Sequence, residues 1–161
     1  MKLDDIDINI LNILQSNGRI TNSQLAADIG ISPPASLERV KRLENAGVIR
    51  RYVALVDPAH IDKGVFALVL VSLAIHQLQS IDQFTAEIKK LPEVLECYHI
   101  TGEEDFLLKI AVKDIAGYED FILTKLTRIP GVRQMKTSFV LSTVKYDTRL
   151  PVDSLTNGQE R

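Results

Sequence analysis

The chain has 161 residues, of which 45% are hydrophobic and 25% are charged, and its formal net charge at pH 7 is −2. This length suits one domain or two small ones, and the composition is typical of a soluble globular protein rather than a disordered one. The small negative charge excludes a strongly basic protein that coats nucleic acid, but it is compatible with a basic patch on one domain.

Targeting and redox signals point to the cytoplasm. The single cysteine, Cys97, excludes an intrachain disulfide and a multi-cysteine zinc site, and we expect it to be a small buried residue in a strand. The first residues, MKLDDIDINI, are acidic, unlike a signal peptide. The longest apolar run, residues 65–75, is too short to span a bilayer. We therefore expect a soluble cytoplasmic protein that does not interact with membranes.

Two helices are predicted at the start of the chain. The segment LDDIDINILNILQSNGR has Asp4 or Asp5 as a cap and apolar residues at helical spacing, and Asn17-Gly18 ends it. A second helix begins at Thr21, where Thr21-Asn22-Ser23-Gln24 matches a capping box, and Gly30 closes it in the left-handed conformation.

The stretch ISPPASLERVKRLENAG predicts a third helix that begins, rather than breaks, at its two prolines. Ser32 is a good N-cap, and prolines are tolerated in the first turn because its N–H groups have no helical partner. Leu37, Val40 and Leu43 are expected to face inward, and a cluster on the opposite side is expected to face outward: Ala35, Glu38, Arg39 and Arg42. Helix, glycine turn and helix, preceded by another helix, indicate a helix-turn-helix over about residues 21–46.

The residues that follow divide the chain into two domains. Residues 48–57 predict a short strand or hairpin, which would give a winged helix-turn-helix domain over residues 1–58. A linker at 59–64 then leads to a pattern of strand, helix, strand, strand, helix, strand over residues 65–150. Capping residues are expected at Ser80 and Asp114, and the last strand at 132 to about 146. This βαββαβ order predicts an α+β ferredoxin-like domain, and residues 151–161 are expected to be a flexible tail.

Basic residues concentrate on the third predicted helix and just beyond it. An arginine-rich helix by itself is most often a solvated face, but after a capped helix and a tight turn it is typical of a recognition helix in the DNA major groove. Small residues near its start would let the backbone approach base edges, and the arginines could reach guanine or phosphate. The predicted DNA-binding residues are Ser32, Pro34, Ala35, Ser36, Glu38, Arg39, Arg42, Arg50 and Arg51.

The stretch RITNSQLAADIGISPPASLERVKRLENAGVIRRYVALVDP resembles the DNA-binding domain of the Lrp/AsnC (feast/famine) family of transcriptional regulators. TGEEDFLLKI followed by IPGV is similar to that family's ligand-sensing domain, and SPPASLERVKRLE and GEEDFLL fit the leucine-responsive branch. The resemblance covers residue 3 to about residue 150. It implies dimers that form through the C-terminal sheet and assemble further into octamers, with an amino acid as effector and no other cofactor.

The turn Thr101-Gly102-Glu103-Glu104-Asp105 has three interpretations. The first is a polar hairpin in which Gly102 has positive φ. The second is a site for a hard cation, which is disfavoured because three adjacent residues do not easily converge on one ion. The resemblance implies instead an effector pocket, in which Asp105 would bind the ammonium of an amino acid and the backbone near Gly102 its carboxylate. Thr101 and Thr137 are further candidates, and the apolar neighbours of the turn favour leucine or methionine.

No catalytic motif accompanies these patterns. The sequence has no glycine-rich phosphate loop, no metal-ligand spacing and no serine elbow, so we predict that the protein is not an enzyme. An alternative hypothesis is an amino-acid-sensing oligomer that acts on a protein partner rather than on DNA. Only the DNA-binding hypothesis needs Arg39, Arg42, Arg50 and Arg51 to be basic.

Overall fold

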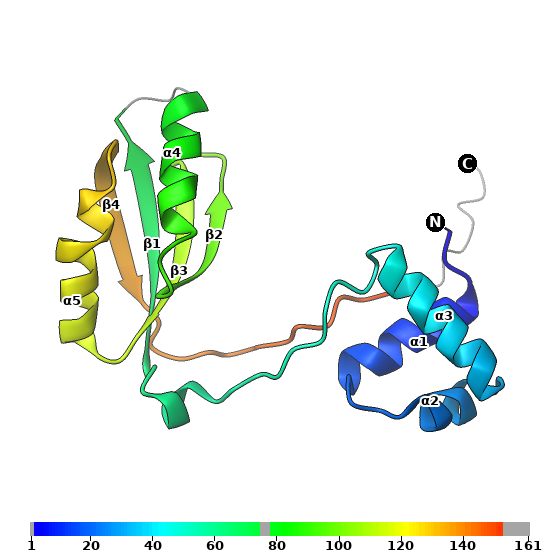
Figure 1. Cartoon of the computed structure of the whole chain (residues 1–161). Helices are drawn as coiled ribbons and strands as arrows, with labels where there is room; N and C mark the ends of the chain where they lie inside the picture. Colours follow the sequence, from blue (N-terminus) through cyan, green and yellow to red (C-terminus); the bar gives the residue numbers. More distant parts are fainter. Residues whose placement is uncertain (1, 75–77, 153–161) are drawn as a thin grey trace, which may run out of the picture. The chain divides into compact units, whose positions relative to one another are not determined.

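The protein forms two compact units in a computed structural model that describes residues 2–74 and 78–152. Within these residues, the first unit comprises 2–55 and 145–152, and the second comprises 56–74 and 78–144. Figure 1 shows the first unit as all helical and the second as a sheet with helices on one face.

Three helices build the first unit: α1 (Asp5–Ser16), α2 (Asn22–Ile29) and α3 (Pro33–Asn45). Each has apolar residues at helical spacing and buries that side against the other two. The buried residues at the centre of the resulting core are Ile10, Leu11, Leu25 and Leu43. Because burying one such side chain contributes about 1.5–3 kcal/mol, this small core is the main source of stability for the unit.

The predicted helix starts are confirmed by their caps. Asp4 accepts a hydrogen bond from the backbone of Asp7, Thr21 from that of Gln24, and Ser32 from that of Ala35. The capping box expected at Thr21 is only half formed, because the Gln24 side chain donates to Asp28 instead. Both prolines of α3 lie in its first turn, as predicted.

The hairpin expected over residues 48–57 is not formed. Residues 50–57 adopt neither helix nor strand, and their apolar side chains Tyr52, Val53, Leu55 and Val56 are exposed. No backbone strand of the described chain pairs with this segment. It ends at a short 3-10 helix, η1 (Pro58–Ile61), which Asp57 caps.

The second unit has the predicted βαββαβ order. Its elements are β1 (Val65–Leu73), α4 (Leu78–Ile88), β2 (Val94–His99), β3 (Phe106–Val112), α5 (Ile115–Thr124) and β4 (Val132–Phe139). The strands form one sheet in the order β2-β3-β1-β4, with antiparallel pairing throughout. The two helices pack on one face, over a core that includes Val69, Val71, Phe84, Phe106, Leu108, Ile110 and Phe121. The ferredoxin-like fold is therefore confirmed.

Several predicted boundaries in this unit differ from the structure. Helix α4 begins at Leu78, so Ser80 lies inside its first turn rather than at its cap. Strand β4 ends at Phe139 rather than near 146, because β1 begins at Val65 and the last backbone bond is from Val140 to Phe66. Cys97 is exposed on the edge strand β2, so the prediction that it is buried was wrong.

The chain returns to the first unit after β4. The backbone of Leu150 exchanges two hydrogen bonds with the side chain of Gln15 in α1, and Val152 packs against the helical core. Residues 145–152 thus group with the helices, whereas the sequence placed residues up to 150 in the second domain. Of the tail expected at 151–161, residues 153–161 lie outside the described residues.

Candidate DNA-binding surface and effector turn

The turn between α2 and α3 fixes one helix against the other. Gly30 has φ 74°, in the left-handed region that glycine adopts without strain, and the backbone N–H of Ile31 donates to Ala26. The side-chain amide of Asn22, at the start of α2, donates to the carbonyl of Pro33 at the start of α3 over 2.8 Å. Both ends of the turn are therefore held, and α3 is presented in one orientation.

The exposed face of α3 agrees only in part with the one that the sequence predicted: Glu38 and Arg42 are exposed as expected, whereas Ala35 and Arg39 are half-buried. Leu43 has no exposed surface, but Leu37 is 45% exposed, so the prediction that Leu37 faces inward was wrong. The exposed residues along α3 include Pro34, Leu37, Glu38, Lys41 and Asn45, and we call this set the outer face. Lys41 was not among the predicted site residues, although it lies one and two helical turns from the exposed Glu38 and Pro34.

Ser36 is buried. Its exposed fraction is 0%, and its hydroxyl has no hydrogen-bond partner within the described structure. The prediction that Ser36 contacts DNA was therefore wrong: its small side chain lets α3 pack closely against the other helices.

Replacing Ser36 by alanine should leave DNA affinity unchanged and change the free energy of unfolding by less than about 1 kcal/mol, because an unpaired hydroxyl contributes little. Ser32→Ala is the matched control: it removes the N-cap bond, so it should destabilise the protein by about 0.5–2 kcal/mol. Thermal unfolding and a DNA titration measure both effects. A tenfold loss of DNA affinity in Ser36→Ala would contradict the buried placement.

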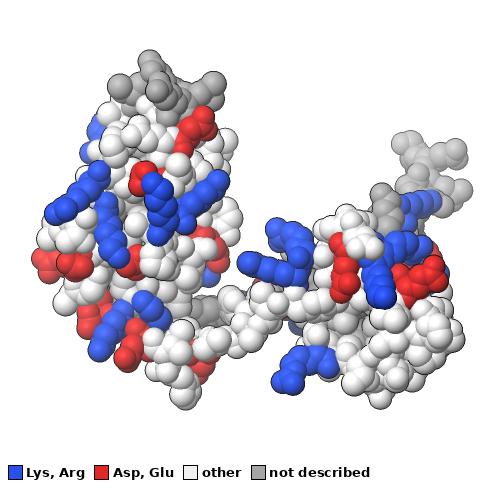
Figure 2. Space-filling model, viewed as in Figure 1, with Lys and Arg blue, Asp and Glu red and all other residues white. Residues whose placement is uncertain are grey.

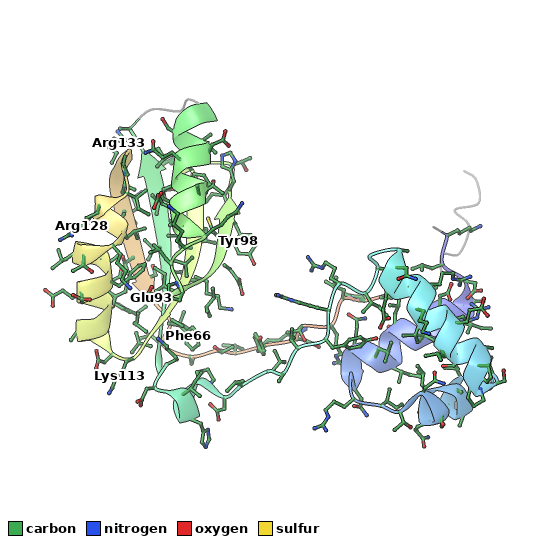
Figure 3. All side chains as sticks on the ribbon, viewed as in Figure 1. Phe66, Glu93, Tyr98, Lys113, Arg128 and Arg133 are labelled. Carbon is green, nitrogen blue, oxygen red and sulfur yellow. The ribbon has the colours of Figure 1, made fainter. Side chains whose placement is uncertain are left out.

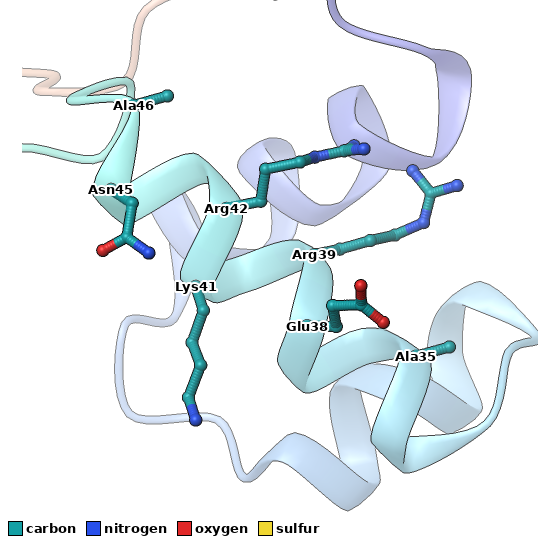
Figure 4. Close-up of a pocket in the computed structure, with 7 residues that line it drawn as sticks. All are labelled: Ala35, Glu38, Arg39, Lys41, Arg42, Asn45 and Ala46. Carbon is teal, nitrogen blue, oxygen red and sulfur yellow. The ribbon is translucent and has the colours of Figure 1, made fainter.

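Arg39 and Arg42 are not part of the outer face as defined, because both reach the start of α1 (Figure 4), although the side chain of Arg42 remains 49% exposed. Arg39 binds the carboxylates of Asp4 and Asp7 at 2.7 and 2.8 Å, and Arg42 binds Asp7 at 2.7 Å. The backbone N–H of Asp7 and then Arg39 hold the pKa of Asp4 below its ordinary value. The sequence predicted that both arginines face outward, and it did not predict that they pair with acids at the start of α1.

The other predicted DNA-binding residues remain accessible, with different surroundings. The Ser32 hydroxyl serves as a helix cap, and Ala35 is half-buried beside an open groove of about 700 Å³ along α3. Arg50 and Arg51 are exposed and, like Lys41, have no ion pair within the described part of the chain. Figure 2 shows basic and acidic groups side by side on the visible face, rather than one large basic patch.

The turn at residues 101–105 is anchored to the end of β1 by Asp105. One carboxylate oxygen of Asp105 accepts a hydrogen bond from the backbone N–H of Leu73 at 2.7 Å, and the N–H of Asp105 donates to Val71. Gly102 has φ 136°, and nothing lies within 4 Å of where a Cβ would be. Thr101 and Gly102 are exposed. The carboxylate predicted to bind a ligand thus already has a structural role in the turn.

Strand β4 reaches the same turn. The ammonium of Lys136 binds Glu104 at 2.5 Å, while the next residue, Thr137, shares a hydrogen bond with the hydroxyl of Tyr118 in α5. Figure 3 shows Phe66 and Lys113 at one end of the sheet and Arg133 at the other, the end at which β1 stops and the turn is anchored. Of the predicted effector residues, Thr101, Gly102 and Asp105 therefore lie in the turn at this end of the sheet, whereas Thr137 pairs with Val69 in the middle of β1 and faces α5.

Two further findings apply to residues 2–74 and 78–152. No three His, Cys, Asp or Glu side chains there are grouped so that they could hold a metal ion. No helix in these ranges is both long and apolar enough to cross a membrane.

The two units together define a class of protein: a helix-turn-helix DNA-binding regulator that carries an amino-acid-binding domain. Comparisons with known proteins agree with this class. Residues 3–50 match the family model for winged helix-turn-helix DNA-binding domains, and residues 66–150 match that for the Lrp/AsnC ligand binding domain. The chain belongs to the Lrp/AsnC family of transcriptional regulators.

Relatives with known names and structures resemble it over nearly their whole length. The leucine-responsive regulatory protein of Salmonella typhimurium is 41% identical over 150 residues, which are 93% of this chain and 92% of that protein. The Escherichia coli protein of the same name is 40% identical over the same shares. A transcriptional regulator from Neisseria meningitidis, solved as its complex with L-Met, is 40% identical, with a TM-score of 0.89 over 93% of this chain and 97% of that one.

Proposed function

We propose that this protein regulates transcription in the cytoplasm by binding operator DNA as a dimer or larger assembly, up to an octamer, and that leucine or methionine modulates this binding. The observation that carries the proposal is the outer face of α3, which a fixed glycine turn presents to solvent with an unpaired cation, Lys41, within the described chain. The names of the relatives, a leucine-responsive protein and an L-Met complex, support the choice of amino acids. No catalytic role is proposed.

The DNA contacts that we propose divide into two kinds. Residues at the start of α3 and on its outer face, Ser32, Pro34, Ala35, Glu38 and Lys41, would lie against base edges in the major groove. Glu38 is suited to accept from cytosine and Lys41 to donate to guanine. Arg50 and Arg51, which follow α3, would bind phosphates and so set affinity rather than sequence preference.

Assembly is proposed through the sheet face that α4 and α5 leave uncovered. Leu68 in the middle of this face is 38% exposed, and Tyr98 of the edge strand β2 is also exposed. A dimer would place two copies of α3 about 34 Å apart, one turn of DNA, so we expect a footprint with two related half-sites. Sedimentation at micromolar concentration tests the assembly, and a strictly monomeric protein would contradict it.

A salt titration against the DNA upstream of the protein's own gene tests DNA binding. Arg50→Gln should weaken binding to all sequences and reduce the slope of log affinity against log salt by about 0.9, the share of one phosphate contact. Lys113→Gln is the matched control, because Lys113 is an exposed cation of the second unit, and it should leave the slope unchanged. No measurable affinity of the wild-type protein for DNA would instead favour a protein partner.

Calorimetry with the twenty amino acids, repeated with sedimentation, tests the effector. A ligand shifts assembly only by its differential affinity for the two states, commonly about 1–3 kcal/mol. We expect leucine or methionine to bind and to change the distribution of oligomers. Binding of neither amino acid at millimolar concentration would overturn this part of the proposal.

A further inference from the structure

The start of α1 holds a carboxylate that is buried yet fully partnered. The side chain of Asp7 has an exposed fraction of 0%. Its Oδ1 accepts hydrogen bonds from Arg39 and Arg42, both at 2.8 Å, and its Oδ2 accepts from Arg42 at 2.7 Å and from the backbone N–H of Asp4 at 3.3 Å. Asp7 therefore connects the first turn of α1 with two successive turns of α3.

This arrangement is specific in geometry as well as in charge. Asp4 and Asp7 lie three residues apart at the start of α1, and Arg39 and Arg42 lie three residues apart on α3. Their three ion pairs fix the distance and the rotation of one helix against the other. The four charges sum to zero. A buried ion pair contributes little net stability compared with apolar packing. Removing one partner, however, leaves the other charge buried and unpaired, which lowers the stability of the fold.

We infer that Asp7 is a positioning residue for DNA recognition: through Arg39 and Arg42 it sets the orientation of α3, and the two arginines are not themselves the groups that read bases. The inference rests on the proposed DNA-binding function. On this inference, α3 has two sides with different tasks. Arg39 and Arg42 bind the acids at the start of α1, and the outer face, with Lys41 and Glu38, contacts DNA. Figure 4 shows this division, since Arg39 and Arg42 extend toward α1 and Lys41 points away from it.

The opposite interpretation makes a prediction of opposite sign. Arg39 and Arg42 could instead bind phosphate, with Asp7 competing for the same two guanidinium groups. Removing the charge of Asp7 would then leave both arginines available to DNA. Affinity for every DNA sequence would then rise, and the salt slope would steepen. If Asp7 orients α3, removing its charge lowers affinity for the operator, because base contacts depend on alignment more than phosphate contacts do.

The test is Asp7→Asn, with Asp5→Asn as the matched control. Asp5 is an exposed carboxylate in the same turn of α1, and it has no side-chain hydrogen bond or ion pair within the described residues. Operator and non-specific DNA are titrated at a temperature at which circular dichroism shows each variant to be folded. We expect Asp7→Asn to lose about tenfold or more in operator affinity and less in non-specific affinity, with an unchanged salt slope, and Asp5→Asn to match the wild type.

Two other results for Asp7→Asn would overturn the inference. A rise in affinity for both DNAs overturns the inference in favour of phosphate contacts, and unchanged operator preference in folded Asp7→Asn overturns it in favour of a purely stabilising role. If Asp7→Asn does not fold, Arg42→Lys replaces it: lysine keeps the charge, but its side chain is shorter, so its ammonium does not reach the position from which Nη2 of Arg42 contacts both oxygens of Asp7. Operator preference should fall in that variant too, and its retention overturns the inference. A wild-type protein that fails to bind DNA contradicts the proposed function, which is a distinguishable result.

Discussion

Replacing Leu43 by alanine is expected to destabilise the first unit by about 2–5 kcal/mol, the range for truncating a large buried side chain. Leu43 has no exposed surface and lies in the small core where α1, α2 and α3 meet. Few other side chains can fill the cavity, because the buried core cluster of this unit is small: within the described chain it comprises Ile10, Leu11, Leu25 and Leu43, with partly buried residues around them. DNA binding should be lost with the fold of this unit.

Leu37→Ala is the matched control for this prediction. It makes the same chemical change two turns earlier on the same helix, at a side chain that is 45% exposed, and it should cost less than about 1 kcal/mol of stability. Denaturant unfolding, followed by circular dichroism, measures both variants. Amino-acid binding by the second unit should survive in Leu43→Ala, because β1 to β4 and their two helices have a separate core. Equal stability of the two variants would contradict the buried placement of Leu43.

The parts of this fold that local signals control were predictable from sequence. The caps at Asp4, Thr21, Ser32 and Asp114 bond to backbone groups three residues away, so the short stretches that predict them also contain their partners. The strand order followed from the succession of elements, because a βαββαβ chain with two split units has few ways to form one sheet. The family resemblance agreed with both.

The side chains that depend on distant partners were predicted less well. The ion pairs of Arg39 and Arg42 were not predicted, because the acidic partners lie 35 residues earlier in the chain. A signal was nevertheless present: two acids three residues apart on one helix complement two arginines three residues apart on another. Leu37 shows the same limit for apolar residues, since spacing predicts a face but not how wide the buried part of that face is.

The ends of the extended segments were also set by tertiary pairing. Residues 140–146 contain valine, leucine and tyrosine, which favour a strand, but the neighbouring strand β1 has already begun at Val65 and offers no further backbone groups. For the same reason, the apolar residues 52–56 do not form the hairpin that their composition predicts. A strand needs a partner, and composition does not supply one.

Asp105 has one role that the structure shows and another that we propose. Its carboxylate accepts the backbone N–H of Leu73 and so holds the turn against β1, whereas the proposed role is to bind the ammonium of an amino acid. Asp105→Ala removes both, so it should lose the response to leucine or methionine. It should also cost about 1–3 kcal/mol of stability by leaving that N–H without an acceptor.

Asp105→Asn distinguishes the two roles, because an amide oxygen can still accept from Leu73 but carries no negative charge. If the carboxylate binds the ammonium, Asp105→Asn should unfold like the wild type, bind DNA like the wild type without effector, and show no amino-acid binding by calorimetry. The loss of charge-assisted bonding to the ligand would reduce affinity by roughly 1.5–3 kcal/mol. Retention of the wild-type response in Asp105→Asn would contradict the direct role and leave Asp105 as the residue that shapes the turn, with the ammonium bound elsewhere.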